Sequence, residues 1–324
     1  MIGSSVTSFS RSRSVVSGSR EASLTELLLF VDATPEIGAG HGMRCAALAE
    51  AWRDLKLGSV AFAGRLTIPF VLQRLHAAGA EVKSRLEPAH RRRVVIADGY
   101  ARALQQRALK TSADLHVVVD DVGAVVPAGF DVIWNPNAYG DANLYPAFVG
   151  AVVAGPEAVP VRSDLPSWCG ARERRIGVSL GGGALPSVLR AAVEKLPVTC
   201  PGWTVSAVGT WSGKVGNVPT DDPWPTLVQC DRLLVASGTT VWEAAAVGIP
   251  VALIQTADNQ SRIFAWARSA GAPGISLAAN GTSDLASLLA KAVMSAVKLP
   301  RIRNGSQAVA HHLASLASQR LASS

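Results

Sequence analysis

The side chains with the clearest capacity for chemistry lie in one short stretch, where a histidine stands among glycines. Gly38, Gly40 and Gly42 surround His41, and Arg44 follows about one helical turn later. Glycines let a backbone come close to a bound group, and a neutral imidazole can accept a proton from water near pH 7. The stretch therefore indicates a general base, His41, beside a bound ligand. The same spacing also allows His41 to be a packing residue, and it allows Arg44 to be either a surface charge or a residue that steadies a loop carbonyl or a bound diphosphate.

Two further loops contain glycines or hydroxyl side chains and suit an anion. Each follows a predicted strand and precedes a predicted helix, where bare amides carry partial positive charge and donate to phosphate oxygens. Two such loops in one half of the chain favour a diphosphate ligand. Glu243 lies one turn into the second of these helices, from where it can reach a ribose diol. The loops are Gly181-Gly182-Gly183 and Ser237-Gly238-Thr239-Thr240.

Two other motifs suggest different enzyme classes. Gly177-Val178-Ser179-Leu180-Gly181 has the spacing of a serine-hydrolase nucleophile elbow, although glycines that continue through Gly183 are unusual there. Ser179 would be the nucleophile in that case, with His311 or His312 as base and Asp231 or Asp258 as acid. The stretch 38–43 resembles a dinucleotide fingerprint, but Met43 stands in place of its last glycine. We therefore predict no bound NAD and no other cofactor.

All these loops depend on strands that end beside them. The apolar run Leu27 to Val31 has the length and continuity of a strand buried on both faces, and helical spacing begins at His41. Strands and helices then alternate, which predicts parallel, doubly wound α/β sheets with a cleft at the carboxyl ends of the strands. The other predicted strands are 59–63, 94–97, 116–119, 132–134, 176–179, 204–208, 233–236 and 250–254. The other predicted helices are 69–78, 102–110, 185–196, 225–229, 240–247, 260–270, 283–297 and 306–321.

The alternation lapses between residues 155 and 174, where three prolines fall in a stretch without periodicity. This break predicts two Rossmann-like domains in tandem with a cleft between them, the glycosyltransferase type-B (GT-B) architecture. We expect a disordered leader over residues 1–23 and an N-terminal α/β domain with the His41 loop over 24–165. A C-terminal nucleotide-binding α/β domain follows over 170–300. The last helix, within 301–324, is expected to pack back on the N-terminal domain.

Composition argues against several other classes. The chain has 324 residues, 48% of them hydrophobic, and no apolar run as long as a membrane span, so we expect a globular protein without membrane insertion. The net charge of +7 does not require nucleic acid, because Arg11, Arg13 and Arg20 lie in the leader and an anionic small molecule suits the remainder. The four cysteines lack CxxC spacing, which indicates reduced thiols in the cytoplasm and no metal site. Asp120-Asp121, the one acidic pair able to hold magnesium, fits better as a hydrogen-bonding pair at a strand end.

Four spaced motifs together resemble a known family. They are Val31-Asp32-Ala33 with Ile37 to Cys45, Ser179-Leu180-Gly181-Gly182, Ser237 to Glu243, and Ala257-Asp258-Asn259-Gln260. In combination they resemble the nucleotide-sugar hydrolases of the pseudaminic acid pathway, a family that includes spore-coat polysaccharide biosynthesis proteins. The resemblance covers about residues 27 to 275. A more distant resemblance links the chain to the UDP-N-acetylglucosamine transferase of peptidoglycan synthesis, which shares the fold and the UDP site.

The resemblance implies a UDP-sugar substrate, UDP-2,4-diacetamido-2,4,6-trideoxy-β-L-altropyranose or a similar amino-deoxy sugar, and other enzymes of cell-surface glycan synthesis as partners. It makes His41 the catalytic base and Tyr100 a polar partner near the attacked carbon. It assigns the uridine diphosphate to Ser237, Gly238, Thr239 and Glu243, and the sugar to Asn259 and Gln260. The sequence keeps Asn135-Pro136-Asn137 but departs from the family at Gly183 and Asp98-Gly99-Tyr100. These departures leave the identity of the sugar open.

The predicted reaction is inverting hydrolysis at the anomeric carbon, with release of UDP and the free sugar. A nucleoside diphosphate leaves as a stabilised anion, so a phosphate-binding loop can replace the acid that ordinary glycosidases need, and one base is sufficient. Two alternatives use the same scaffold. One is a glycosyltransferase, in which a sugar or lipid hydroxyl replaces water, and the other is a nucleotide-sugar binding protein without catalysis.

Overall fold

The structure is a computed structural model. It describes residues 25–34, 36–83, 92–99, 101–111, 113–123, 128–170, 173–181, 185–209, 217–218, 222–277 and 284–321. The predicted leader, residues 1–23, lies outside the described residues, as do Tyr100, Gly182 and Gly183.

A seven-stranded sheet with the order β3-β2-β1-β4-β5-β6-β7 forms the centre of the first lobe, and its printed strand pairs are all parallel. Its order changes direction between β1 and β4, which is the switch point at which ligands bind in doubly wound sheets. The elements of this lobe are β1 (Glu26–Val31), α1 (Gly40–Asp54), β2 (Val60–Ala63), α2 (Pro69–Ala77), β3 (Ala80–Val82), β4 (Arg93–Asp98), α3 (Arg102–Leu109), β5 (Leu115–Val119), β6 (Val132–Trp134) and β7 (Ala151–Val153), with short 3-10 helices at Ala142–Leu144 and Pro156–Ala158.

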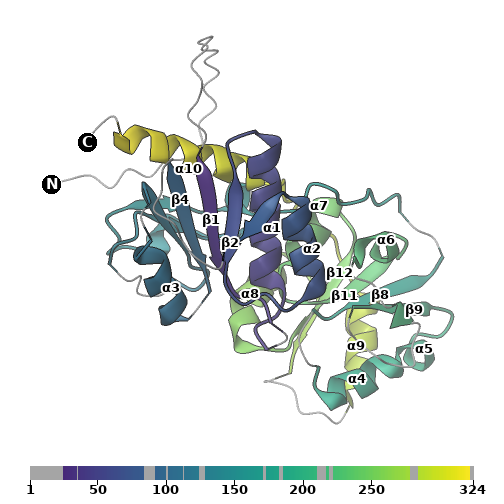
Figure 1. Ribbon diagram of the computed structural model, residues 1–324. Helices are drawn as coiled ribbons and strands as arrows, with labels where there is room; N and C mark the ends of the chain where they lie inside the picture. The colour runs from purple at the N-terminus through teal and green to yellow at the C-terminus, as the bar shows by residue number, and fades with distance from the viewer. Residues whose placement is uncertain are drawn as a thin grey trace.

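A six-stranded parallel sheet with the order β10-β9-β8-β11-β12-β13 forms the second lobe and repeats the same topology. Its switch point lies between β8 and β11. The elements are β8 (Arg175–Ser179), α4 (Ser187–Glu194), α5 (Leu196–Thr199), β9 (Thr204–Val208), β10 (Asn217–Val218), α6 (Trp224–Leu227), β11 (Arg232–Ala236), α7 (Thr240–Val247), β12 (Val251–Gln255), α8 (Ser261–Ser269), β13 (Gly274–Ser276) and α9 (Leu285–Met294), with a 3-10 helix at Asp258–Gln260. The predicted parallel, doubly wound architecture is confirmed (Figure 1).

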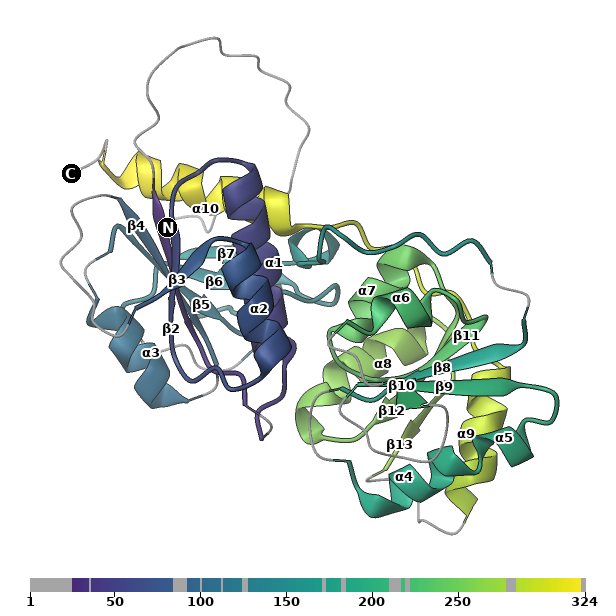
Figure 2. The same ribbon diagram turned by 45° about the vertical axis from the view of Figure 1, so that its right-hand side comes forward.

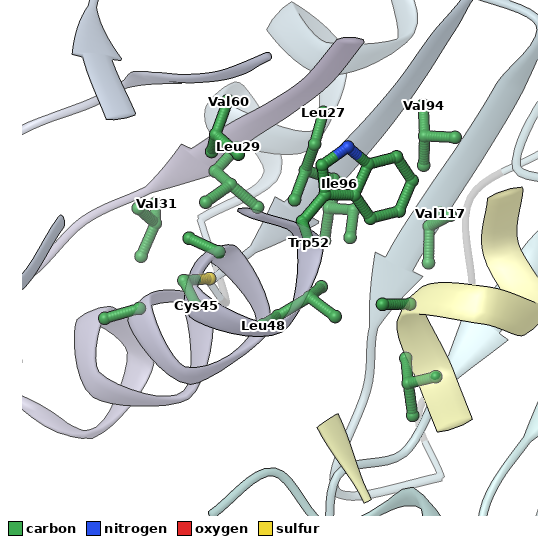
Figure 3. Packing of buried hydrophobic residues seen from close by; sticks show 14 of the residues in the cluster. Leu27, Leu29, Val31, Cys45, Leu48, Trp52, Val60, Val94, Ile96 and Val117 are labelled. Atoms are coloured by element: carbon green, nitrogen blue, oxygen red, sulfur yellow. The ribbon is translucent and has the colours of Figure 1, made fainter. Parts of the chain in front are cut away.

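The central strands are buried on both faces, as the continuous apolar run in β1 predicted. Leu27 to Val31 are between 0 and 1% exposed, and one face of β1 packs against α1. Figure 3 shows Cys45, Leu48 and Trp52 of α1 directed at the side chains of β1 and β4. Gly42 permits close packing of α1 on α2, because an added Cβ would lie 2.3 Å from Val71 Cγ1. The role of this glycine is therefore helix packing rather than contact with a ligand.

The last helix, α10 (Ser306–Leu321), returns to the first lobe after the chain has completed the second (Figure 2). Its buried residues Val309, Ala310, Leu313 and Ala317 belong to the same core as β1, β4 and α1. The chain thus crosses between the lobes twice, through residues 154–170 and through residues 298–305.

The edge strands β3, β7, β10 and β13, each of two or three residues, were not predicted. The helix predicted over 185–196 is observed as the shorter α4, and a separate short helix, α5, begins at Leu196 with Pro197 in its first turn. The helix predicted over 283–297 is shorter and ends at Met294.

Candidate active site

A cavity of about 910 Å³ lies between the two lobes, and loops from both switch points form its walls. The first lobe contributes the loop after β1 and the start of α1, including Gly38, Gly40 and His41. The second lobe contributes the loops after β8 and β11. The two walls approach one another closely, since a Cβ built on Gly40 would lie 3.7 Å from Thr239 Cγ2. The topology therefore places the predicted base opposite the predicted anion loops.

His41 forms a buried pair with Asp98 at the end of β4. Its Nδ1 lies 2.6 Å from Asp98 Oδ1, and Asp98 is fully buried. Burial alone would raise the pKa of Asp98, but the guanidinium of Arg44 and the ring of His41 outweigh it and hold that pKa well below its usual range. An ionised carboxylate only accepts hydrogen bonds, so the tautomer with its proton on Nδ1 donates to Asp98, whereas the other tautomer accepts from Arg44 Nη2, which lies 2.8 Å from Nδ1. The first tautomer has its lone pair on Nε2, as a general base requires.

Arg44 contacts the same carboxylate through two nitrogens. Nε donates to Asp98 Oδ2 at 2.6 Å, Nη2 donates to Oδ1 at 2.5 Å, and Nη1 donates to Asp121 Oδ2 at 3.1 Å. The predicted roles for Arg44 were a surface charge or a ligand of the diphosphate. Neither fits well, because Arg44 is 7% exposed and all three nitrogens contact protein carboxylates. Arg44 lines the cavity but acts first as a support for Asp98.

Cys45 completes the surroundings of Asp98. Its Sγ donates to Asp98 Oδ2 at 3.4 Å, and burial followed by the charge of Asp98 raises the thiol pKa well above its usual range. The thiol therefore stays protonated and serves as a hydrogen-bond donor.

Sequence reasoning did not identify Asp98 as the partner of His41. Its position at a strand end was noted, but the pairing depends on strand order. In the structure β4 lies directly beside β1, and Val31 is in register with Asp98. Two neighbouring strand ends thus bring the carboxylate to the start of α1, which is the signal that a correct strand order would have supplied.

Of the two loops predicted to bind an anion, the structure describes Gly181 after β8 and residues 237–240 after β11. Gly181 follows β8 with a φ of +84°, a left-handed conformation that favours glycine, and lines the cavity. Gly238, Thr239 and Thr240 line it at the start of α7. Among the described residues, no hydrogen-bond acceptor is found for the amides of Thr239 and Thr240. These amides are suited to an anion at the helix start.

Ser237 differs from its predicted role. It is fully buried, and its hydroxyl donates to the carbonyl of Ile254 at 3.2 Å. The hydroxyl proton is thus used within the second lobe, and Ser237 is better described as a residue that fixes the loop after β11 than as a phosphate donor.

Glu243 lies in the first turn of α7 and lines the cavity. Its Oε2 accepts a hydrogen bond of 2.9 Å from the indole Nε1 of Trp224. Burial raises the pKa of Glu243 to about 7. Asn259 and Gln260 line the cavity from the 3-10 helix before α8, and Gln260 Oε1 accepts from the amide of Thr256 at 2.8 Å. The Gln260 oxygen therefore closes a turn, and only its amide nitrogen is left for a ligand.

The serine-hydrolase interpretation does not fit the arrangement. Ser179 lines the cavity, whereas His311 and His312 lie on α10, which packs against α1 in the first lobe and does not line it. Asp231 is also engaged elsewhere, accepting from the amide of Arg175 at 2.9 Å. Ser179 therefore has neither of the predicted bases beside it.

Other features of the site were not predicted. Arg74, Arg162, Asp164 and Asp222 form one wall of the cavity, although Arg162 and Asp164 lie in a stretch that the sequence indicated only as a linker. In the part of the chain that the structure describes, no three His, Cys, Asp or Glu side chains gather as in a metal site. Within the same residues, no helix combines the length and apolarity needed to cross a membrane.

Solved structures with the same arrangement were found. MurG of Acinetobacter baumannii is 11% identical, with a TM-score of 0.53 over 90% of this chain and 99% of that one. The spinosyn forosaminyltransferase SpnP is 15% identical, with a TM-score of 0.56 over 93% and 96%. A Listeria monocytogenes protein assigned as a UDP-N-acetylglucosamine 2-epimerase is 10% identical, with a TM-score of 0.54 over 93% and 98%. The chain has the GT-B fold.

At these identities the GT-B likeness concerns the fold alone. A scan against family models finds no match, and neither does a search of curated proteins. The narrower resemblance to nucleotide-sugar hydrolases therefore rests on the four motifs of the sequence.

Proposed function

We propose that this GT-B protein hydrolyses a UDP-sugar at its anomeric C–O bond, with His41 as the base that activates water. The observation that carries the proposal is the buried His41–Asp98 pair, which lies across the cavity from the anion loops of the second lobe. A base and an anion site on opposite walls suit a reaction that attacks carbon on one side and releases a diphosphate on the other.

In the proposed step, Nε2 of His41 takes a proton from water while the water oxygen bonds to the anomeric carbon. The bond between that carbon and the diphosphate oxygen breaks, and its electron pair leaves with UDP. Attack from the face opposite to UDP inverts the anomeric centre. Asp98 keeps Nδ1 protonated and stabilises the imidazolium that forms.

The leaving group is proposed to bind at the second lobe. Amides at Gly181, Thr239 and Thr240 would donate to the diphosphate oxygens, so that no acid is needed for departure. Glu243 would accept hydrogen bonds from the ribose diol. Asn259 and the amide nitrogen of Gln260 would contact the sugar, and Tyr100, assigned by the family resemblance, would lie near the attacked carbon. The sequence motifs favour an amino-deoxy sugar.

A glycosyltransferase is the second candidate. It is favoured by the likeness to SpnP, a transferase, and by an apolar strip on the first-lobe wall of the cavity formed by Ile37, Met43, Phe70 and Ala77. An acceptor that lies on this strip would bring its hydroxyl to His41 in place of water.

The test is release of UDP from a panel of UDP-sugars, with and without added acceptors. UDP released without an acceptor, together with a free sugar of inverted configuration by NMR, supports hydrolysis. Release that requires an acceptor identifies the transferase. Failure to bind UDP by calorimetry and failure to release it from any donor would overturn both.

A further inference from the structure

Arg162 lies in the first crossover between the lobes, and its guanidinium is buried between two carboxylates. The side chain is 4% exposed. Nε and Nη2 donate to the two oxygens of Asp164 at 2.6 and 2.7 Å, and Nη1 and Nη2 donate to the two oxygens of Asp222 at 2.6 and 2.9 Å. Two bidentate pairs on one guanidinium fix its plane and the position of both acids.

Asp222 connects this guanidinium to the wall of the cavity. Its Oδ1 accepts a hydrogen bond of 3.1 Å from the amide of Trp224, at the first turn of α6. The Trp224 indole is 1% exposed and donates from Nε1 to Glu243 Oε2 at 2.9 Å. A continuous series of contacts thus runs from Arg162 through Asp222 and Trp224 to Glu243.

The series leaves one oxygen of Glu243 for a ligand. Oε2 is held by Trp224, whereas Oε1 accepts no hydrogen bond from the residues that the structure describes. Glu243 lines the cavity. Its carboxylate is therefore oriented by Trp224 through Oε2, and Oε1 can accept a hydrogen bond from a ligand.

The other end of the cluster reaches the first lobe. Arg74 of α2 donates to both oxygens of Asp164 at 3.2 Å and also pairs with Glu50 of α1. Residues from α1, α2, the crossover and the second lobe therefore form a single ionic cluster beside Glu243.

We propose that Arg162 is a positioning residue for ribose recognition, acting through Asp222 and Trp224 to aim the Glu243 carboxylate at the ribose diol. The inference rests on the proposed function, because it takes the ligand to be a nucleoside diphosphate. It adds a residue of the crossover, outside both sheets, that determines how strictly the site requires ribose hydroxyls.

The geometry favours positioning over simple stabilisation. The side chains of Asp164 and Asp222 are 55% and 41% exposed, and ion pairs with exposed carboxylates contribute little net stability, because solvent screens their attraction. The planar guanidinium of Arg162 does, however, donate hydrogen bonds to four carboxylate oxygens, and it thereby fixes the orientation of both carboxylates. The single ammonium of a lysine cannot make this set of contacts. Arg162→Lys should therefore keep the charge of the cluster and lose its alignment.

The experiment measures binding of UDP and of 2′,3′-dideoxy-UDP to the full chain by calorimetry, and takes the ratio of the two affinities. At pH 8, where the Glu243 carboxyl is ionised, a hydrogen bond to a charged group predicts that the parent protein prefers UDP by about 10-fold or more. Glu243→Gln should bring the ratio close to one. Arg162→Met and Arg162→Lys should lower it severalfold, with the affinity for dideoxy-UDP unchanged.

Two further variants make the result decisive. Arg53→Met, which removes an exposed ion pair with Asp54, should leave the ratio unchanged. The double variant Arg162→Met with Glu243→Gln should have the same affinity ratio as Glu243→Gln alone, because both substitutions act on one contact. If Arg162→Met does not fold, Asp222→Asn removes one charge of the series at constant size and should lower the ratio in part.

The outcomes separate the two proposals. If the parent does not bind UDP, the proposed function fails. If Glu243→Gln collapses the ratio while the Arg162 and Asp222 variants keep it, the proposed function stands and the role of Arg162 is wrong. Equal losses for UDP and dideoxy-UDP in the Arg162 variants would also refute it, since they would indicate a general disturbance of the site.

Discussion

Three side chains donate to Asp98, and this set of contacts determines what His41 can do. The proposed base requires the tautomer in which Nδ1 of His41 donates to this carboxylate and Nε2 is the acceptor. His41→Asn keeps a polar side chain and removes the acceptor nitrogen. We expect it to lower kcat by about 10²–10⁴-fold with little change in the affinity for UDP-sugar.

Asp98→Asn provides the matching variant for this prediction, because it keeps the size of the side chain and removes its charge. It should also lower kcat while UDP binding persists. Steady-state kinetics and calorimetry measure both effects. Normal turnover in His41→Asn would show that His41 is a packing residue.

Glu243 gives a second prediction, on stability and pH. Burial raises its pKa from an ordinary value of 4.5 to about 7. Between these pH values the folded protein holds a proton that the unfolded chain has lost, so the free energy of unfolding falls as pH rises through this window. Glu243→Gln removes the effect. It should be more stable than the parent at pH 8, on the order of 1–3 kcal/mol, and similar to it at pH 4.

Denaturant unfolding at the two pH values measures the Glu243 difference. Glu173→Gln, which changes an exposed carboxylate, serves as the control and should show no such dependence. An equal shift of Glu243→Gln at both pH values would count against a raised pKa.

At the scale of single elements, α10 contributes to the core of the first lobe although it follows the second lobe in the chain. Leu313 is fully buried in the core shared with α1 and β1. Leu313→Ala leaves a cavity in that core and should lower the free energy of unfolding by about 2–5 kcal/mol. His311→Ala, on the exposed face of the same helix, should change it by less than about 0.5 kcal/mol. A small effect of Leu313→Ala in denaturant titration would mean that α10 is only loosely packed.

Local sequence patterns predicted the elements better than the contacts between them. The apolar run Leu27 to Val31 predicts β1, and the helical spacing of Cys45, Leu48 and Trp52 predicts α1. These predictions succeed because burial on one or two faces of an element requires apolar residues at regular positions. The order of strands in a sheet produces no such local sequence pattern. The pairing of His41 with Asp98, 57 residues away, depends on it. The cluster around Arg162 depends instead on how the crossover packs between the two lobes, which no local pattern predicts. The individual loops of the candidate site were therefore predicted from the sequence, but the contacts between its buried charged side chains were not.

At the scale of the whole molecule, a ligand in the cavity should stabilise both lobes together. UDP at a hundredfold its dissociation constant should add about 2.7 kcal/mol to the free energy of unfolding, provided that the unfolded chain does not bind it. Thermal unfolding at increasing UDP concentration measures this, with uridine as a control that lacks the diphosphate and should act only at much higher concentration. A melting temperature that does not respond to UDP would argue against a nucleotide site.

The return of α10 to the first lobe has a consequence for synthesis on the ribosome. The strands of the first lobe emerge first, yet its core lacks Val309, Leu313 and Ala317 until the strands of the second lobe have also been translated. The second lobe, whose strands lie between, has all of its sheet before then. The lobe that is made first is thus completed last, and a transcript cut short after codon 300 yields a chain with an uncovered apolar face on α1. Such a face attracts chaperones and proteases. Helix α10 is therefore the element that covers this face.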